Sequence, residues 1–190
     1  MTARTRPPEV VWTESPTTSS EGREWRVLRV PPKGIGGLII LSHEVVGTDT
    51  HYFGGRTVPH GKEQCNACDA GNQKRWHGYL AVWNPKAASK WILEITDAAG
   101  DTFKKMFAKR TTLRTLSFAG QRVPCKPNGT LIVRLTESDW ASDGLPHAPD
   151  LRRMLMRMWG FREETYEYDM NSAFATRKDA LRSNGQPKSG

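Results

Sequence analysis

Two neighbouring segments in the middle of the chain restrict the fold more than any other feature. Residues 76–84, WHGYLAVWN, and residues 89–96, SKWILEIT, are both apolar runs of strand length, and the NPKAA between them has turn composition. This pattern predicts a β-hairpin. The strand period assigns the side chains of the first run to two faces, Tyr79, Ala81 and Trp83 on one and Leu80 and Val82 on the other.

Further short apolar runs predict more strands before and after this hairpin. They lie at residues 24–30, 38–47, 113–123 and 129–137. A helix is expected directly after the hairpin, capped by Thr96 or Asp97. Phe103, Met106 and Phe107 are expected to fall on one stripe of this helix, together with Arg110. A second, short amphipathic helix is expected within 148–160.

The expected fold is mostly β with one or two helices. If the run at 24–30 is set aside as an edge strand, five strands remain with a helix between the third and the fourth, and this order matches the OB-fold, a partly open Greek-key barrel, although a small β-barrel of another kind fits too. A metal-binding loop is inserted in this barrel. The expected divisions are a disordered lead-in at 1–24, the barrel at 25–140 with its loop at 51–68, a short amphipathic helix at 141–160 and a flexible tail at 161–190.

The pair Cys65 and Cys68, at Cys-x-x-Cys spacing, lies in a segment of loop composition. A redox dithiol of the thioredoxin type needs a βαβ setting, which is not evident here, so the pair is interpreted as half of a metal site. Zinc takes four nitrogen or sulfur ligands, and two histidines lie upstream. The prediction is a structural Zn²⁺ site formed by His51, His60, Cys65 and Cys68. Since the loop has few apolar residues, the metal would be needed to fold it.

Other residues compete for places in this ligand set. His77 is the chief alternative for one histidine position, because it begins the strand that follows the loop. His43 lies in an apolar run and Cys125 in a distant turn, so both are weaker candidates. Four protein ligands would leave no open position for water, which indicates a structural rather than a catalytic site.

The net charge of +8 is concentrated in one part of the chain. Between His60 and Lys126 there are twelve Lys or Arg and five Asp or Glu. Concentrated positive charge interleaved with aromatic residues is typical of proteins that bind single-stranded nucleic acid through phosphate contacts and base stacking. Trp76 is expected to be the most exposed aromatic residue, since it follows two cations. The expected contact residues are Tyr52, Phe53, Lys74, Arg75, Trp76, Tyr79, Trp83, Lys86, Lys90, Trp91, Arg110, Arg114 and Arg122.

The function expected first is single-stranded DNA binding without strong sequence preference and without enzymatic activity. An RNA-binding zinc protein on the same barrel is the alternative, because stacking platforms accept either sugar. A metal-dependent nuclease is a further alternative, but it needs clustered carboxylates. The acidic residues of the core are spread over different expected elements: Glu44, Asp49, Glu63, Asp69, Glu94 and Asp97.

The chain shows no apolar run of membrane-spanning length, and its first 25 residues lack the apolar stretch of a secretory signal. A cytoplasmic protein without membrane contact is therefore expected.

These features resemble those of the zinc-containing OB-fold single-stranded DNA-binding proteins of phages and mobile elements. The resemblance covers about residues 36–137, and its motif is His51 or His60 with Cys65 and Cys68. It implies a metal-ordered subdomain beside a DNA cleft, with replication or recombination proteins as partners. The best-known members use one histidine and three cysteines over a longer span, and the acidic tip that often recruits partners is replaced here by a basic end, RKDALRSNGQPKSG.

Overall fold

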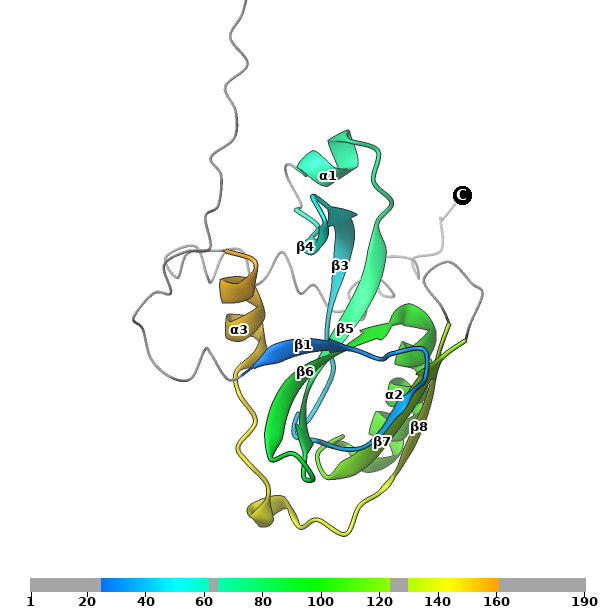
Figure 1. Cartoon of the computed structure of the whole chain (residues 1–190), viewed down its shortest axis with the longest axis vertical. Coiled ribbons are helices and arrows are strands. Elements are labelled where there is room, and N and C mark those ends of the chain that lie inside the picture. The colour runs from blue at the N-terminus through cyan, green and yellow to red at the C-terminus, as the bar shows by residue number, and fades with distance from the viewer. Residues whose placement is uncertain (1–24, 62–64, 124–129, 161–190) are drawn as a thin grey trace, which may run out of the picture.

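The computed structural model describes residues 25–61, 65–123 and 130–160 (Figure 1). The expected lead-in, the expected tail and Cys125 lie outside these residues. The elements in chain order are β1 (Arg26–Arg29), β2 (Ile35–Ile40), β3 (Val46–Phe53), β4 (Arg56–Pro59), α1 (Asn66–Asp69), β5 (Arg75–Asn84), β6 (Ser89–Thr96), α2 (Asp97–Arg110), β7 (Leu116–Arg122), β8 (Leu131–Glu137), η2 (Ser142–Gly144) and α3 (Leu151–Met158).

The chain is mostly β, as expected, but its strands form an open sheet. The eight-stranded sheet has the order β1-β6-β5-β2-β7-β8, and β3 and β4 branch from β5. In the described part of the chain no pairing joins β1 to β8 or β6 to β8, so the expected barrel is not closed. The reason lies in β1, which pairs in parallel with β6 from Arg26↔Trp91 to Arg29↔Glu94 and so occupies the edge through which β6 would close the barrel.

The predicted hairpin is confirmed as β5 and β6. The two strands pair from His77↔Thr96 to Asn84↔Ser89. The edge of the ten-residue β5 that faces away from β6 pairs with two further strands, its first half with β3 and its second half with β2. The single strand expected at 38–47 is instead the end of β2 and the start of β3. Both run antiparallel to the same edge of β5, but the register shifts between Ile40↔Val82 and Val46↔Tyr79, which interrupts the strand.

An arm made of β3, β4 and α1 projects from the sheet where β3 leaves β5 (Figure 1). The segment 51–68, expected to be an irregular loop, therefore contains a hairpin and a helical turn. The hairpin closes through Gly54 and Gly55, both at positive φ, where glycine is favoured.

Both faces of the sheet are buried, as the two-sided pattern of β5 predicts. Leu80 and Val82 belong to the core that α2 covers, where the rings of Phe103 and Phe118 stack with centroids 6.3 Å apart. Tyr79 and Ala81 belong to a second core covered by α3, through Leu151, Leu155 and Met156. The sheet thus has little free surface along the middle of β5.

The helix expected after the hairpin is confirmed as α2, which begins at Asp97. Phe103 is buried and Met106 packs against the core. Phe107 does not complete the stripe, because it is exposed, and Arg110 pairs with Glu137 of β8. None of the described helices has the length and apolar character needed to cross a membrane.

Candidate metal centre and nucleic-acid interface

The arm brings the four predicted metal ligands together. His51 lies near the end of β3, and His60 follows β4, where its backbone N–H donates to the Asp49 carbonyl at 2.8 Å. Cys65 is the N-cap of α1 and Cys68 lies within that helical turn. One ligand atom from each of these four residues lies within 4.8 Å of the other three.

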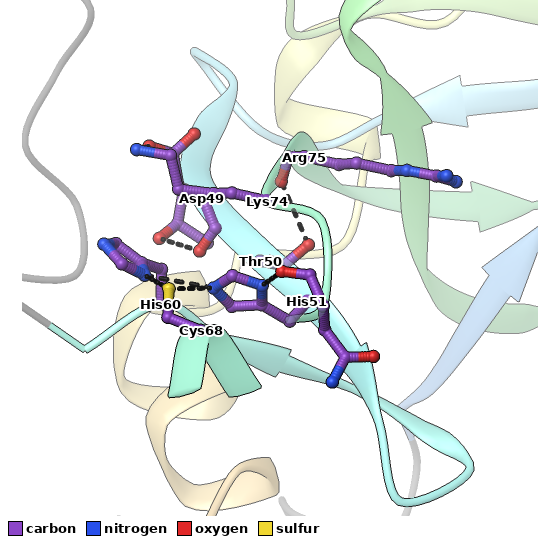
Figure 2. Close-up of polar contacts among 9 residues, drawn as sticks. Asp49, Thr50, His51, His60, Cys68, Lys74 and Arg75 are labelled. Atoms are coloured by element: carbon purple, nitrogen blue, oxygen red, sulfur yellow. Dashed lines mark hydrogen bonds and ion pairs between the residues drawn. The ribbon is translucent and has the colours of Figure 1, made fainter. Parts of the chain in front are cut away.

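The separations between three of these atoms are close to those around a single tetrahedral metal ion. Cys68 Sγ lies 3.4 Å from His51 Nε2 and 3.5 Å from His60 Nδ1, and the two nitrogens are 3.0 Å apart (Figure 2). A tetrahedron with zinc–nitrogen bonds of about 2.0–2.1 Å and zinc–sulfur bonds of about 2.3 Å has edges of about 3.3–3.8 Å. Both sulfur–nitrogen separations fall in this range and the nitrogen–nitrogen separation is shorter. The donor types and their clustering could therefore hold a metal ion with four protein ligands.

The second nitrogen of His51 is held in the way that metal-binding histidines require. Its Nδ1 lies 3.0 Å from the carbonyl oxygen of Asn72, which can only accept a hydrogen bond. Nδ1 must then carry the proton, so Nε2 presents its lone pair to the centre of the cluster. His51 is almost fully buried, which keeps the ring in this orientation.

The local electrostatics also favour metal binding. Burial raises the pKa of Cys65, but hydrogen bonds from the backbone of Cys68 and Gly61 outweigh it, so the pKa lies below the ordinary value. Burial and the neighbouring Cys65 raise the pKa of Cys68. Burial, followed by the charge of Lys74, lowers the pKa of His60 and favours the neutral imidazole that a metal needs. A cation at the centre would offset the repulsion between two adjacent thiolates.

The competing ligands lie elsewhere. His77 Nδ1 bonds to Thr50 Oγ1 at 2.5 Å, and His43 Nδ1 lies 3.0 Å from Thr112 Oγ1. Among the described residues only one group of at least three His, Cys, Asp or Glu side chains could hold a metal, and it is the predicted set. Asp49, beside this group, is engaged by Lys74 at 3.1 Å.

A second polar cluster lies where the arm joins the sheet, and we call it the junction. Strand register puts Arg75 and His77 of β5 on one face, with Thr96 and Glu94 of β6 beside them. Arg29 of β1 is paired across the sheet with Glu94, and its Nε lies 2.9 Å from Glu94 Oε1.

Two contacts tie the junction to its surroundings. Arg29 donates to Thr57 Oγ1 of the arm, and Arg122, at the end of β7, donates to the Val30 carbonyl at 2.8 Å. The charges of Arg29, Arg122 and Arg75 all act on His77, whose pKa is lowered mainly by burial and further by these three cations, against the opposing effect of Glu94. In the junction, the charges of three guanidinium groups and of one buried carboxylate, that of Glu94, therefore act on His77.

The aromatic residues expected to stack bases occupy different places. Tyr52 and Phe53, at the tip of the β3–β4 hairpin, are exposed, Tyr52 to 65%. Tyr79 is only 2% exposed and lies edge-on to Trp159 with ring centroids 5.8 Å apart. Its phenol, whose pKa burial raises, offers no surface to a base.

The tryptophans expected at the interface are half-buried. Trp76, expected to be the most exposed, lies against Gly47, Gly78 and Gly100 instead. Trp83 packs edge-on against Trp140, and Trp91 packs on the α2-side core with its Nε1 bonded to Ser89. These rings therefore contribute mainly to packing.

The cations expected to bind phosphates also differ in their exposure and in their bonding partners. Lys86 and Arg75 are exposed, while Lys74 is half-exposed in its ion pair with Asp49. Lys90 lies 5.8 Å above the Trp25 ring. Arg110 is paired with Glu137, and Arg122 is bonded to Val30.

Arg114 is a structural residue. It is buried, and its guanidinium donates to the carbonyls of Leu41, Ser142, Leu145 and Pro146. It joins the end of β2 to the segment that leads into α3, and no nitrogen is directed to solvent for a phosphate.

Sequence reasoning missed Arg29, although its position was visible. The alternation in EWRVLRV places two arginines on an edge strand, but only the parallel pairing with β6 shows that the half-exposed Arg29 lies beside Glu94 and forms an ion pair with it. Lys33 and Arg134 were missed too, because they lie far apart in the chain and meet only through the pairing of β2, β7 and β8. The chain matches no family model, no curated protein and no solved structure.

Proposed function

We propose that this protein binds single-stranded nucleic acid, with DNA as the first choice, and that a structural zinc ion holds the arm against the binding surface. The observation that carries this proposal is the junction. Its three guanidinium groups, from Arg29, Arg75 and Arg122, all act on His77, Arg29 is paired with the buried carboxylate of Glu94, and each of the three is held by a hydrogen bond. Such an excess of fixed positive charge is suited to the phosphates of a polynucleotide backbone.

The connectivity of the sheet supports a nucleic-acid ligand. Five strands follow the order of an OB-fold: β2, β5, β6, β7 and β8, with α2 between the third and the fourth of them. An OB-fold would close by pairing β6 with β8, but here that edge of β6 pairs with β1. The arm then occupies the connection between the first two of these strands. OB-folds bind oligonucleotides on the face of their second and third strands, flanked by this connection and by that between the last two strands. The junction lies on that face of β5 and β6.

The arm tip supports single strands over duplexes. Tyr52 and Phe53 are adjacent, exposed and followed by two glycines and the exposed Arg56. Exposed aromatic rings beside cations are used to stack unpaired bases, and stacking is largely independent of sequence.

The binding test is fluorescence anisotropy of a labelled oligothymidylate with the zinc-loaded full chain over a range of salt concentrations. Affinity should fall steeply with salt, because phosphate contacts release counterions. Arg75→Gln should weaken binding about tenfold and reduce the slope of log K against log salt by about 0.7, the value for one phosphate contact on a single strand. Lys105→Gln, which removes one charge from the exposed side of α2, is the matched control.

Competition with oligouridylate tests the RNA-binding alternative, and competition with a hairpin duplex tests the preference for single strands. Incubation with magnesium tests the nuclease alternative, which predicts cleavage of the oligomer. Binding that is insensitive to salt, or equal effects of Arg75→Gln and Lys105→Gln, would show that the junction is not the phosphate-binding surface.

The metal test is elemental analysis of the purified protein. About one zinc ion per chain is expected, and Cys65→Ser should lose it. His77→Gln should keep the metal, because His77 is bonded to Thr50 outside the cluster. Retention of a full equivalent in Cys65→Ser would remove Cys65 from the ligand set.

A further inference from the structure

A shallow groove lies on the outer face of β2, β7 and β8. It has a volume of about 460 Å³, and its lining residues are Lys33, Gly34, Ile35, Gly36, Ala119, Gly120, Gln121, Ile132 and Arg134. The groove is separate from the metal centre and contains none of the residues of the junction.

The floor of the groove is nearly free of side chains. Three glycines and Ala119 line it, and a β-bulge between Ile35 and Leu38 interrupts the pairing of β2 with β7. Bulges and glycines within strands are found where a ligand approaches the backbone closely. The flat floor therefore suits a planar group.

The walls of the groove combine an apolar side chain with two cations. Ile132 is 61% exposed, which is unusual for an isoleucine in a strand. Lys33 and Arg134 line the same groove, and neither forms an ion pair with a residue in the described part of the chain. A ligand with an apolar planar part and negative charge, such as a nucleotide, matches this lining.

The groove is linked to the junction through the β1–β2 connection. Arg122 bonds to Val30, and Lys33 follows Val30 by three residues. Gln121, the neighbour of Arg122 on β7, lines the groove and is paired with Ile132. A nucleic-acid strand that leaves the junction at Arg122 would thus reach Lys33 and the groove along this connection.

We propose that this groove binds a second stretch of the same single strand, with a base on the glycine floor and its phosphates at Lys33 and Arg134. This inference rests on the proposed function. It predicts a binding footprint longer than the junction alone, in which short oligomers contact only the junction and longer ones reach the groove.

The test is a length series of oligothymidylates, from about 4 to about 20 nucleotides, with the zinc-loaded full chain. For long oligomers, the double variant Lys33→Gln/Arg134→Gln should bind about tenfold more weakly and with a salt slope smaller by about 1.4, corresponding to two phosphate contacts. Short oligomers should bind this variant as they bind the wild type. The control Lys105→Gln/Lys109→Gln removes the same charge from α2 and should leave the length dependence unchanged.

A variant that changes no charge separates the effect of the groove on binding from the effect of the net charge. In Gly36→Val the new Cβ lies 3.5 Å from Ala119 Cβ, an ordinary contact, so the fold tolerates it while the floor is filled. It should weaken only the long oligomers. Equal losses at all lengths, or losses no larger than those of the control, would overturn the groove and leave the proposed function standing, whereas a wild type that binds no oligomer at low salt would overturn both.

Discussion

At the scale of single residues, His77 links the two candidate sites. It lies on β5 between the arm and the sheet, bonded to Thr50, whose neighbour His51 is a candidate metal ligand. Its pKa lies below 6.5, first because of burial and further because of nearby arginines. The neutral imidazole is therefore the form that the folded chain favours.

The pH dependence of stability follows from this lowered pKa. Between the folded pKa and 6.5 the unfolded chain binds more protons than the folded chain, so His77 contributes stability that is fully present above pH 6.5 and is lost as the pH falls through the folded pKa. His77→Gln should flatten this part of the curve. Urea unfolding of zinc-loaded protein from about pH 5 to 7.5 measures the difference, and His43→Gln, at an exposed histidine, should leave the curve unchanged.

A bound polynucleotide should act on His77 in the opposite direction. A phosphate placed among Arg29, Arg75 and Arg122 would offset the cations that lower the pKa of His77. The imidazole resonances, followed by NMR, should then titrate at higher pH in the complex. A pKa of His77 that is identical with and without oligomer would argue against a phosphate at the junction.

At the scale of elements, the pairing of β3 with β5 depends on a glycine. The ring of Trp76 lies over Gly47, where an added Cβ would be 2.4 Å from Trp76 Cζ2. Gly47→Ala should therefore displace the ring and destabilise the protein by about 1–3 kcal/mol. Gly144→Ala, where a new Cβ meets no atom within 4 Å, is the control in thermal or urea unfolding.

The interpretation of Trp76 can be checked by combining variants. If the cost of Gly47→Ala comes from the ring, then Gly47→Ala with Trp76→Leu should cost less than the sum of the two single changes. Additive effects would show that Gly47 is needed for its backbone rather than for the space above it.

The same elements show how far the sequence predicts the structure. The β5–β6 hairpin, the start of α2 and the four clustered His and Cys residues follow from local signals: strand alternation, a helix start and ligand spacing. Trp76 and Arg114 could not be placed in this way. Trp76 lies against a glycine 29 residues away, and Arg114 bonds to carbonyl groups of Leu41 and of the 142–146 segment. Only the tertiary fold brings these groups near.

Register explains the other differences. A polar strand residue such as Arg29 points to solvent or to a neighbour according to its partner strand, and one sequence does not specify that partner. The same holds for closure of the sheet. Nothing in EWRVLRV indicates that β1 pairs in parallel with β6, and that pairing is what leaves the sheet open.

At the scale of the whole molecule, the arm and the sheet differ in what stabilises them. The sheet has a large apolar core on each face. Beyond Thr50 the described part of the arm consists of the end of β3, the short β4 and α1, and its buried side chains are those of His51 and Ala67. Such a segment has too little apolar burial to offset its conformational entropy, so the metal should be its main stabilising element.

Removal of the metal should therefore unfold the arm and leave the sheet. In hydrogen exchange, amides of residues 51–60 and 65–72 should lose protection in chelated protein, while those of β6 and the second half of β5 keep it. Cys65→Ser, which cannot regain the metal, should reproduce this pattern in the presence of zinc. Loss of protection throughout the chain would show that the metal stabilises the whole fold, and no change at all would show that it has no structural role. Because Thr57 of the arm bonds to Arg29 of the junction, the chelated protein should also bind oligomers more weakly although its sheet remains folded.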